Sequence, residues 1–153
     1  MTLYKKYSAA MYQISRNIIK NDMQAEEAMQ DAFLQAFGNL SDFRGEVTFG
    51  SWLKRIVVNK SLDYLKKDKM YMDTNSTNDL QLIEDIDEVE LCNKIETVKE
   101  AMNSLPDNYR IIISLYYLEG YDHEEISQIL DVSYENSRTM LSRAKSKLVT
   151  LIN

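Results

Sequence analysis

Apolar residues recur at helical spacing along the first part of the chain. A first stripe advances in steps of three or four, as one face of a helix requires, and consists of Leu3, Tyr7, Met11, Ile14 and Ile18. Asn21 and Asp22 interrupt this stripe, and Asp22 is predicted to be the N-cap of a second helix. The predicted inner face of that helix is Ala25, Ala28, Met29, Ala32, Phe33, Ala36, Phe37 and Leu40.

A third helix is predicted from about Phe49 to Lys67, after a loop that holds Gly45. Thr48 stands where its side chain can cap this helix. The inward positions of the helix are Leu53, Ile56, Val57 and Leu65. Three helices over residues 1–67 are enough for one small domain.

Residues 68–87 are polar and acidic without a sustained period, which predicts a flexible linker. A second domain is expected over residues 88–153. It opens with a new helical stripe made of Leu91, Ile95, Val98, Met102 and Leu105. Pro106 is placed to open the next helix, and Gly120 to end it.

The C-terminal region carries the spacing of a helix-turn-helix. Asp122 can cap a short helix that ends at Leu130, and Glu125 can complete a capping box. After the three-residue turn 131–133 a longer helix is predicted, with an inner stripe of Ser137, Leu141, Ala144 and Leu148. Opposite that stripe lie Glu135, Arg138, Thr139, Ser142, Arg143 and Ser146.

Composition agrees with an all-α fold, and the expected architecture is two small helical domains joined by an acidic flexible linker, the C-terminal domain being a helix-turn-helix. The 153 residues include only 4 glycines and 1 proline. Leu, Met, Ala, Glu and Lys are frequent, and these residues lose little rotamer freedom in a helix.

Charge is distributed unevenly along a chain whose net charge is −6. Residues 1–69 hold 11 Lys or Arg against 8 acids, whereas residues 70–97 hold 8 acids against Lys94 alone. The last 18 residues carry four basic side chains and no acid. Two basic regions therefore flank an acidic middle, which favours nucleic-acid binding by both ends of the chain in spite of the acidic total.

The sequence offers no recognisable catalytic or metal-binding constellation. Cys92 and His123 are the only residues of their types, so we expect no enzyme activity, no metal and no cofactor. His123 is expected to be a solvated side chain without a titration role. No apolar run approaches the roughly 18 residues of a membrane span, so no membrane insertion is expected, and the location should be cytoplasmic.

Several stretches in a fixed order resemble one family, the extracytoplasmic-function (ECF) type of RNA polymerase sigma factor. LYKKYSAAMY, AEEAMQDAFLQAFGNL and FRGEVTFGSWLKRIVVNKSLDYLKK are similar to sigma region 2. SLPDNYRIIISLYYLEGYDHEEISQILDVSYENSRTMLSRAKSKL resembles region 4 almost end to end. The resemblance implies a factor that binds core RNA polymerase and promoter DNA, promotes strand opening, and is held in check by an anti-sigma factor.

The resemblance also assigns roles to individual residues. Polymerase binding falls on Glu27, Gln30 and Asp31, although an exposed polar helix face explains the same residues without a partner. Contacts with the minus-ten element fall on Arg44, Glu46, Val47, Thr48, Phe49, Trp52, Arg55, Asn59 and Lys60. Trp52 is equally consistent with a core position. Contacts with the minus-thirty-five element fall on Glu135, Arg138, Thr139, Ser142, Arg143 and Lys145.

Three departures from the family pattern stand out in the second domain. Asp131 occupies the turn position where the family often has glycine, Ser137 replaces an apolar residue, and Met140 replaces a basic one. Aspartate tolerates a left-handed backbone at modest cost.

Two other functions remain open at this point. The chain could be a stand-alone helix-turn-helix repressor or activator whose first domain only dimerises, since dimers suit palindromic operators. It could also be a helical protein-interaction adaptor whose acidic middle recruits a basic partner. The placement of the basic clusters favours the promoter-specificity factor over the adaptor.

Overall fold

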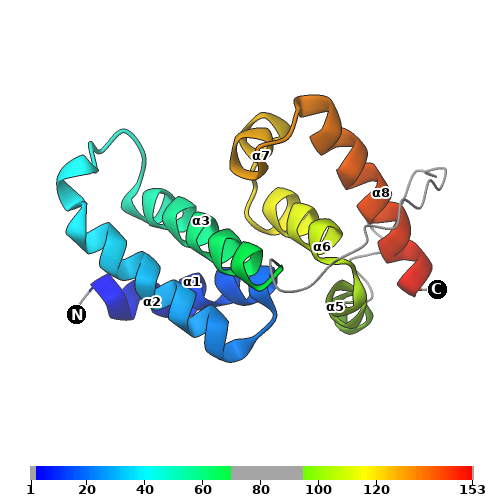
Figure 1. The fold of residues 1–153 in the computed structure, drawn as a ribbon, viewed down its shortest axis with the longest axis horizontal. Helices are drawn as coiled ribbons and strands as arrows, with labels where there is room; N and C mark the ends of the chain where they lie inside the picture. The colour runs from blue at the N-terminus through cyan, green and yellow to red at the C-terminus, as the bar shows by residue number, and fades with distance from the viewer. Residues whose placement is uncertain (1–2, 70–94, 153) are drawn as a thin grey trace. The chain divides into compact units, whose positions relative to one another are not determined.

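The computed structural model describes residues 3–69 and 95–152, and all the regular elements in these two ranges are helical (Figure 1). The all-α prediction is confirmed. The chain divides into two compact units, Met1–Asn75 and Ser76–Asn153. Most of the predicted linker lies outside the described residues. Asp68 and Lys69, which the linker prediction included, belong to the last turn of a helix.

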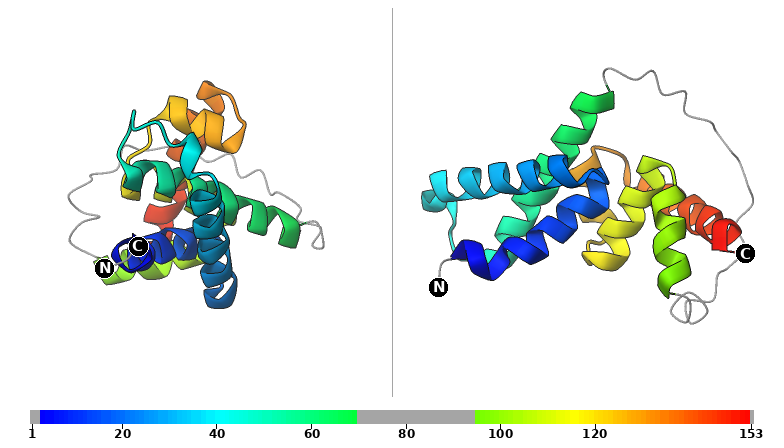
Figure 2. Two further views of the ribbon diagram at one scale, coloured as in Figure 1. Left: turned by 90° about the vertical axis from the view of Figure 1, so that its left-hand side faces the viewer. Right: turned by 90° about the horizontal axis from the view of Figure 1, so that it is seen from below.

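The N-terminal unit packs α1 (Leu3–Ile19), α2 (Asp22–Gly38) and α3 (Phe49–Lys69) on one another (Figures 1 and 2). A short turn of 3-10 helix, η1 (Leu40–Asp42), follows α2. The predicted stripe of α1 is buried at Met11, Ile14 and Ile18. These residues meet a core completed by Ala25, Ala28, Met29, Ala32, Phe33, Ala36, Leu53, Val57, Val58, Leu62 and Leu65.

Two details of α2 differ from the predictions. Asn21, not Asp22, is the N-cap, because its Oδ1 accepts a 3.0 Å hydrogen bond from the backbone N–H of Gln24. Asp22 is the first helical residue, and its carboxylate bonds to Arg16 and Tyr12 of α1 instead. Phe37 and Leu40, which the sequence predicts on the inner face of this helix, are 38% and 45% exposed, because Phe37 lies in the last turn of α2 and Leu40 lies beyond its end, in η1.

A buried pair of serines lies where α1 crosses α3. The Ser61 hydroxyl donates a 2.7 Å hydrogen bond to the carbonyl oxygen of Val57, and its Oγ lies 2.8 Å from the Oγ of Ser15, within hydrogen-bond distance. Both serines are completely buried. Small side chains at this crossing let the two backbones approach, and the hydroxyls satisfy one another there.

The described part of the C-terminal unit contains α5 (Ile95–Ser104), α6 (Asp107–Ile113), η2 (Ser114–Leu118), α7 (His123–Leu130) and α8 (Tyr134–Ile152). α8 packs against α5, α6 and α7. Pro106 occupies the N-cap position of α6, where its carbonyl oxygen accepts a 3.0 Å hydrogen bond from the N–H of Arg110 and its missing N–H leaves no helical bond unmade. Among the described residues of this unit, one charged side chain is buried in the core: Arg110, which donates a hydrogen bond to the carboxylate of Asp107 over 2.6 Å.

α6 widens into a π-helical turn, η2, before the chain reaches the helix-turn-helix. The backbone N–H of Glu119 bonds to the carbonyl of Ser114 over 3.0 Å, a step of five residues. Gly120 then takes a left-handed φ of 77°, and Tyr121 N–H bonds back to Leu115 over 3.0 Å. Gly120 therefore ends the helix as predicted.

Candidate nucleic-acid interface

The first helix of the helix-turn-helix begins with the predicted capping box. Asp122 Oδ1 accepts a 2.8 Å hydrogen bond from the N–H of Glu125, and Glu125 Oε1 accepts one of 3.1 Å from the N–H of Asp122. Tyr121 is buried before the cap, and Ile126 and Ile129 bury the inner face of α7. The eight-residue helix is thus fixed at its start and along one side.

The turn into α8 is set by two residues. Asp131 adopts a left-handed φ of 56°, which confirms that aspartate can serve where glycine is frequent. Ser133 Oγ accepts a 3.0 Å hydrogen bond from the N–H of Asn136 and so caps α8. α8 consequently starts at Tyr134, the start that the sequence predicts.

α8 separates a buried stripe from an outer face much as predicted. The buried residues are Ser137, Leu141, Ala144 and Leu148. On the other side Glu135, Arg138 and Thr139 are exposed, while Ser142, Arg143 and Lys145 are half-buried. Ser146 departs from its predicted place, because its hydroxyl oxygen is buried without a hydrogen-bond partner among the described residues.

His123 is not the solvated side chain that the sequence suggested. Its Nδ1 lies 2.9 Å from the hydroxyl of the fully buried Ser137, and its ring stacks on Tyr116 with centroids 4.9 Å apart. Burial, and secondarily the cation of Arg138, lowers the pKa of His123 below its usual value. The polar residue that departs from the family pattern is therefore paired with the only histidine of the chain.

A continuous row of rings runs beside α8, with a cation at each end. Tyr117 contacts Tyr116 with centroids 4.9 Å apart, and His123 contacts Tyr134 with centroids 5.9 Å apart. The guanidinium carbon of Arg138 lies 6.0 Å from the centroid of Tyr134, and Lys145 Nζ lies 5.1 Å from that of Tyr117. Arg138 and Lys145 are two turns apart, so the row links two cations of one helix face.

In the N-terminal unit, the loop before α3 is exposed and lies next to a cluster of aromatic side chains. Arg44, Glu46 and Val47 are exposed, and Gly45 takes a left-handed φ of 76°. Thr48 is exposed too, and its Oγ1 accepts a 3.2 Å hydrogen bond from the N–H of Ser51, which confirms its capping role.

The aromatic cluster next to this loop contains three rings. Trp52 lies 5.2 Å from Phe43 and 5.8 Å from Phe49, between ring centroids, and both Trp52 and Phe49 are half-buried. Tyr7 of α1 extends the cluster with a 5.5 Å contact to Phe49. Trp52 therefore packs in the protein and still presents part of its ring to solvent.

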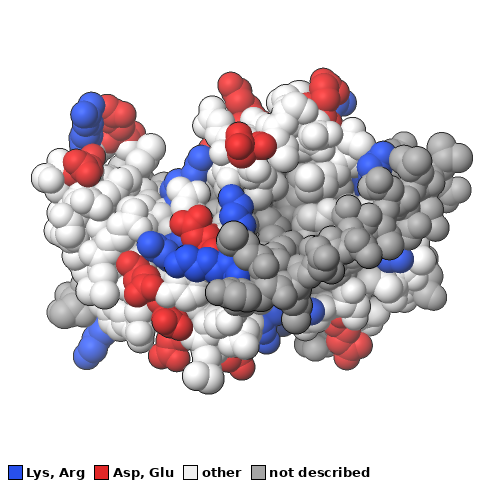
Figure 3. Space-filling model, in the orientation of Figure 1, with Lys and Arg blue, Asp and Glu red and all other residues white. Residues whose placement is uncertain are grey.

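α3 places the remaining predicted DNA contacts along its outer side. Asn59 is exposed, and Arg55 and Lys60 are half-buried. Figure 3 shows Lys and Arg side chains gathered around α3 on the face in view, with Asp and Glu side chains between them. The basic side chains of this surface can attract phosphates.

The predicted polymerase-binding residues lie on α2, but in different settings. Glu27 and Gln30 are exposed, whereas Asp31 is half-buried and accepts a hydrogen bond from the hydroxyl of Tyr64 in α3. Burial, together with that bond, raises the pKa of Tyr64 above its usual value. Asp31 thus helps to join α2 to α3.

Sequence reasoning missed two exposed apolar residues on the same face of α2. Met23 is 81% exposed and Leu34 is 71% exposed. Together with Glu27 and Gln30 they follow the steps 23, 27, 30, 34, which is one helical stripe. This spacing was the available signal. We call the stripe Met23, Glu27, Gln30 and Leu34 the outer α2 face.

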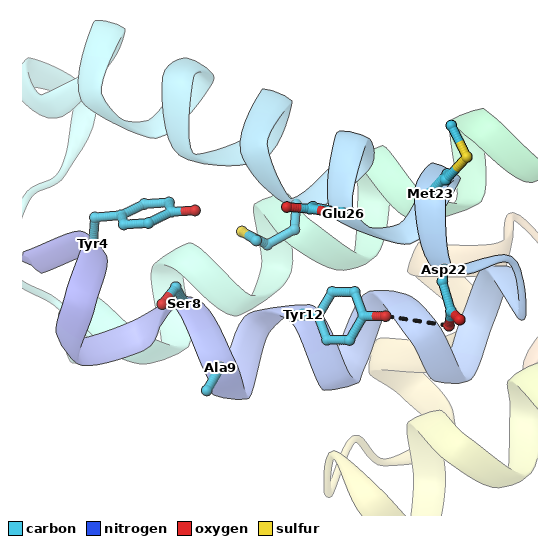
Figure 4. A pocket seen from close by; sticks show the side chains of 8 residues that line it. Tyr4, Ser8, Ala9, Tyr12, Asp22, Met23 and Glu26 are labelled. Atoms are coloured by element: carbon cyan, nitrogen blue, oxygen red, sulfur yellow. Dashed lines mark hydrogen bonds between the residues drawn. The ribbon is translucent and has the colours of Figure 1, made fainter.

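A shallow groove of about 390 Å³ lies between α1 and α2 (Figure 4). Tyr4, Ser8 and Tyr12 line it from α1, and Asp22 and Glu26 from α2. The Tyr12 hydroxyl donates to Asp22 over 3.2 Å and closes one end.

Membrane and metal features are absent from the described part of the chain. Within residues 3–69 and 95–152, every helix is too short or too polar to cross a bilayer. The same ranges contain no group of three or more His, Cys, Asp or Glu side chains arranged to hold a metal ion.

Comparison with known proteins agrees with this geometry. Residues 3–70 match the family model for Sigma-70 region 2, and residues 95–148 match that for Sigma-70, region 4. The ECF RNA polymerase sigma factor SigW of Bacillus subtilis is 29% identical over 93% of this chain and 82% of its own length. SigM of the same organism, also an ECF sigma factor, is 27% identical over 99% and 93%.

A solved structure shares the fold. The sigma factor RpoE from Bartonella quintana, in complex with the anti-sigma factor NepR, superposes with a TM-score of 0.68 at 18% identity. The likeness covers 97% of this chain and 93% of the other. With both sigma regions matched in order along the chain and ECF factors among its relatives, this protein belongs to the sigma-70 family, as a member of the ECF type.

Proposed function

We propose that the protein is a promoter-specificity factor that binds core RNA polymerase, recognises promoter DNA and promotes strand opening, while the polymerase performs all the chemistry. The observation that carries this proposal is α8, which presents Glu135, Arg138 and Thr139 to solvent from a capped helix-turn-helix. Such a helix fits the major groove, where its N-terminal residues reach base edges. This role places the protein in the cytoplasm with the polymerase.

The C-terminal unit, expected over residues 88–153, would bind the minus-thirty-five element. Arg138 and Thr139 lie within the first two turns of α8, so they are the candidates for base readout, with Glu135 and Ser142 beside them. Arg143 and Lys145 lie further along the helix and are half-buried, and we assign them to phosphates because the N-terminal residues of such a helix are the ones that reach base edges.

The N-terminal unit, expected over residues 1–67, would capture a separated base of the minus-ten element. A flipped base needs stacking and hydrogen bonds that compensate the lost stacking in the duplex. The exposed loop with Arg44, Glu46 and Val47 supplies polar and apolar groups, and the rings of Phe49 and Trp52 lie at its base. Asn59 and Lys60, with Arg55, would follow the adjoining strand along α3.

The outer α2 face would bind the polymerase. Exposed Met23 and Leu34 flank the polar Glu27 and Gln30, and methionine is a residue that protein interfaces favour. Asp31 would act mainly through its bond to Tyr64, which fixes α2 on α3. Because a solved relative is bound to an anti-sigma factor, we also propose a partner of that class for this chain.

Run-off transcription tests the proposal. The purified chain is added to core RNA polymerase from the organism that carries the gene, with genomic fragments as templates. Discrete transcripts that need both proteins support it. Binding of the chain alone to one DNA site, as tightly as in the presence of polymerase, would instead indicate a stand-alone repressor or activator, and no DNA interaction at all would favour an adaptor.

A matched pair of variants tests the outer α2 face. Leu34→Lys should abolish co-purification with core polymerase, whereas Gln35→Lys places the same charge on the neighbouring exposed position, about 100° around the helix, and should not. Equal retention of both variants would refute the assignment of this face.

A further inference from the structure

Tyr134 is the first residue of α8 and carries a large aromatic ring. It is 50% exposed, so burial of its ring in the core does not account for it. It also stands at the end of α8 that the proposed function directs into the groove, one turn before Arg138. The inference below rests on that proposed function and deepens it.

The ring of Tyr134 is supported from the protein side. His123 meets it edge to face, with centroids 5.9 Å apart and planes at 77°. His123 is itself fixed by the hydroxyl of buried Ser137 and by stacking on Tyr116. Tyr134 is thus the outermost member of an ordered row, and its ring has less rotational freedom than a lone exposed tyrosine.

Arg138 lies over this ring. Residues four apart on a helix are neighbours, and the guanidinium carbon of Arg138 is 6.0 Å from the ring centroid, at the outer edge of the cation–π range. A ring at this place restricts the orientations of a long side chain. Restriction before binding reduces the entropy lost when the guanidinium meets a base.

We propose that Tyr134 is a positioning residue for specificity: its ring, held by His123, orients the guanidinium of Arg138 toward base edges of the promoter DNA. Tyr117 is the matched comparison at the other end of the row. It is 41% exposed and contacts Lys145, which we place on the phosphate backbone. Loss of the Tyr117 ring should weaken binding to all DNA sequences alike, because phosphates carry no sequence information directly.

The experiment uses the full chain with core polymerase and a pool of DNA duplexes randomised in the upstream element. Sequences bound by each holoenzyme are enriched and counted. We expect Tyr134→Leu to reduce base preference by about two- to fivefold at the positions where Arg138→Ala reduces it. Tyr134→Phe keeps the ring and should restore the preference, and Tyr117→Leu should leave the profile unchanged while lowering affinity. Circular dichroism verifies that each variant keeps its helical content.

Three results separate the possibilities. If Tyr134→Leu keeps the wild-type profile while Arg138→Ala flattens it, the proposal is overturned and the proposed function stands. If Tyr134→Leu has its full effect even in the Arg138→Ala background, the tyrosine contacts DNA itself and the positioning role is refuted. If the wild-type holoenzyme enriches no sequence, the proposed function fails and this inference fails with it.

Discussion

The caps of two helices offer a test of whether the two units unfold separately. Asp122 caps α7 in the C-terminal unit through the 2.8 Å bond to Glu125 N–H, and Asn21 caps α2 in the N-terminal unit through the 3.0 Å bond to Gln24 N–H. Replacing such a cap by alanine costs about 1 kcal/mol. For units of this size that cost lowers the midpoint of thermal unfolding by roughly 4–8 °C.

The single tryptophan makes the assignment of transitions direct. Trp52 is the only tryptophan of the chain, and it lies in the N-terminal unit among Phe43 and Phe49. Its fluorescence therefore follows that unit, whereas far-ultraviolet circular dichroism follows the helices of both. We expect Asp122→Ala to lower only the unfolding midpoint of the C-terminal unit, which fluorescence does not detect. Asn21→Ala should lower only the midpoint of the N-terminal unit, which fluorescence does detect.

Asp122→Asn is the control for charge, because asparagine keeps a side-chain oxygen that can accept from the Glu125 N–H. This variant should unfold near the wild-type midpoint. If Asp122→Ala lowered the fluorescence transition as much as the dichroism transition, the units would unfold as one and the reasoning would be refuted. A midpoint unchanged in every variant would show that the capping bonds contribute nothing to stability.

Three further predictions concern single side chains. Arg138→Ala should reduce the binding free energy by about 1–3 kcal/mol on the preferred minus-thirty-five sequence and relax base discrimination there. Arg143→Ala should weaken binding to all sequences equally and reduce the slope of log affinity against log salt concentration by about one unit. Holoenzyme affinities measured across a salt series will test both. Since the folded pKa of His123 lies below the unfolded value of about 6.5, protonation favours unfolding, so the C-terminal unit should lose stability as the pH falls from about 7.5 to 5.5. His123→Gln should flatten that dependence in urea unfolding, and an unchanged slope would contradict the shift. Tyr64→Phe removes the bond to Asp31 and should destabilise the N-terminal unit by about 1 kcal/mol, measured by Trp52 fluorescence, and an unchanged midpoint would show that this bond is not stabilising.

Local signals in the sequence predicted the helices and their ends well. The capping box of Asp122 and Glu125 and the left-handed Asp131 depend on residues within a few positions of one another, so a reader of the sequence has all the partners in view. The predicted N-cap of α2, Asp22, differs from the observed one, Asn21, by a single residue, because both side chains can serve as caps.

Contacts between distant residues could not be predicted in this way. His123 pairs with Ser137 fourteen positions away, and Asp31 pairs with Tyr64 thirty-three positions away. Helical periodicity says which face a residue occupies but not which side chain of another helix lies opposite. The roles assigned to Arg138 on DNA and to Glu27 on the polymerase remain predictions, because they concern surfaces whose partners lie outside the chain.

The π-helical turn at Ser114–Leu118 has a consequence for insertions and deletions in this protein. A π turn holds one residue more than the α-helical turn it replaces. Deleting one residue there can therefore close the π turn to a regular α turn and leave the helix-turn-helix that follows in place. The same deletion inside α8 would instead rotate every later residue of that helix by about 100°. The loss of one codon should therefore be less harmful in this segment than in α8, and the length of the segment should be under weaker selection than the length of α8.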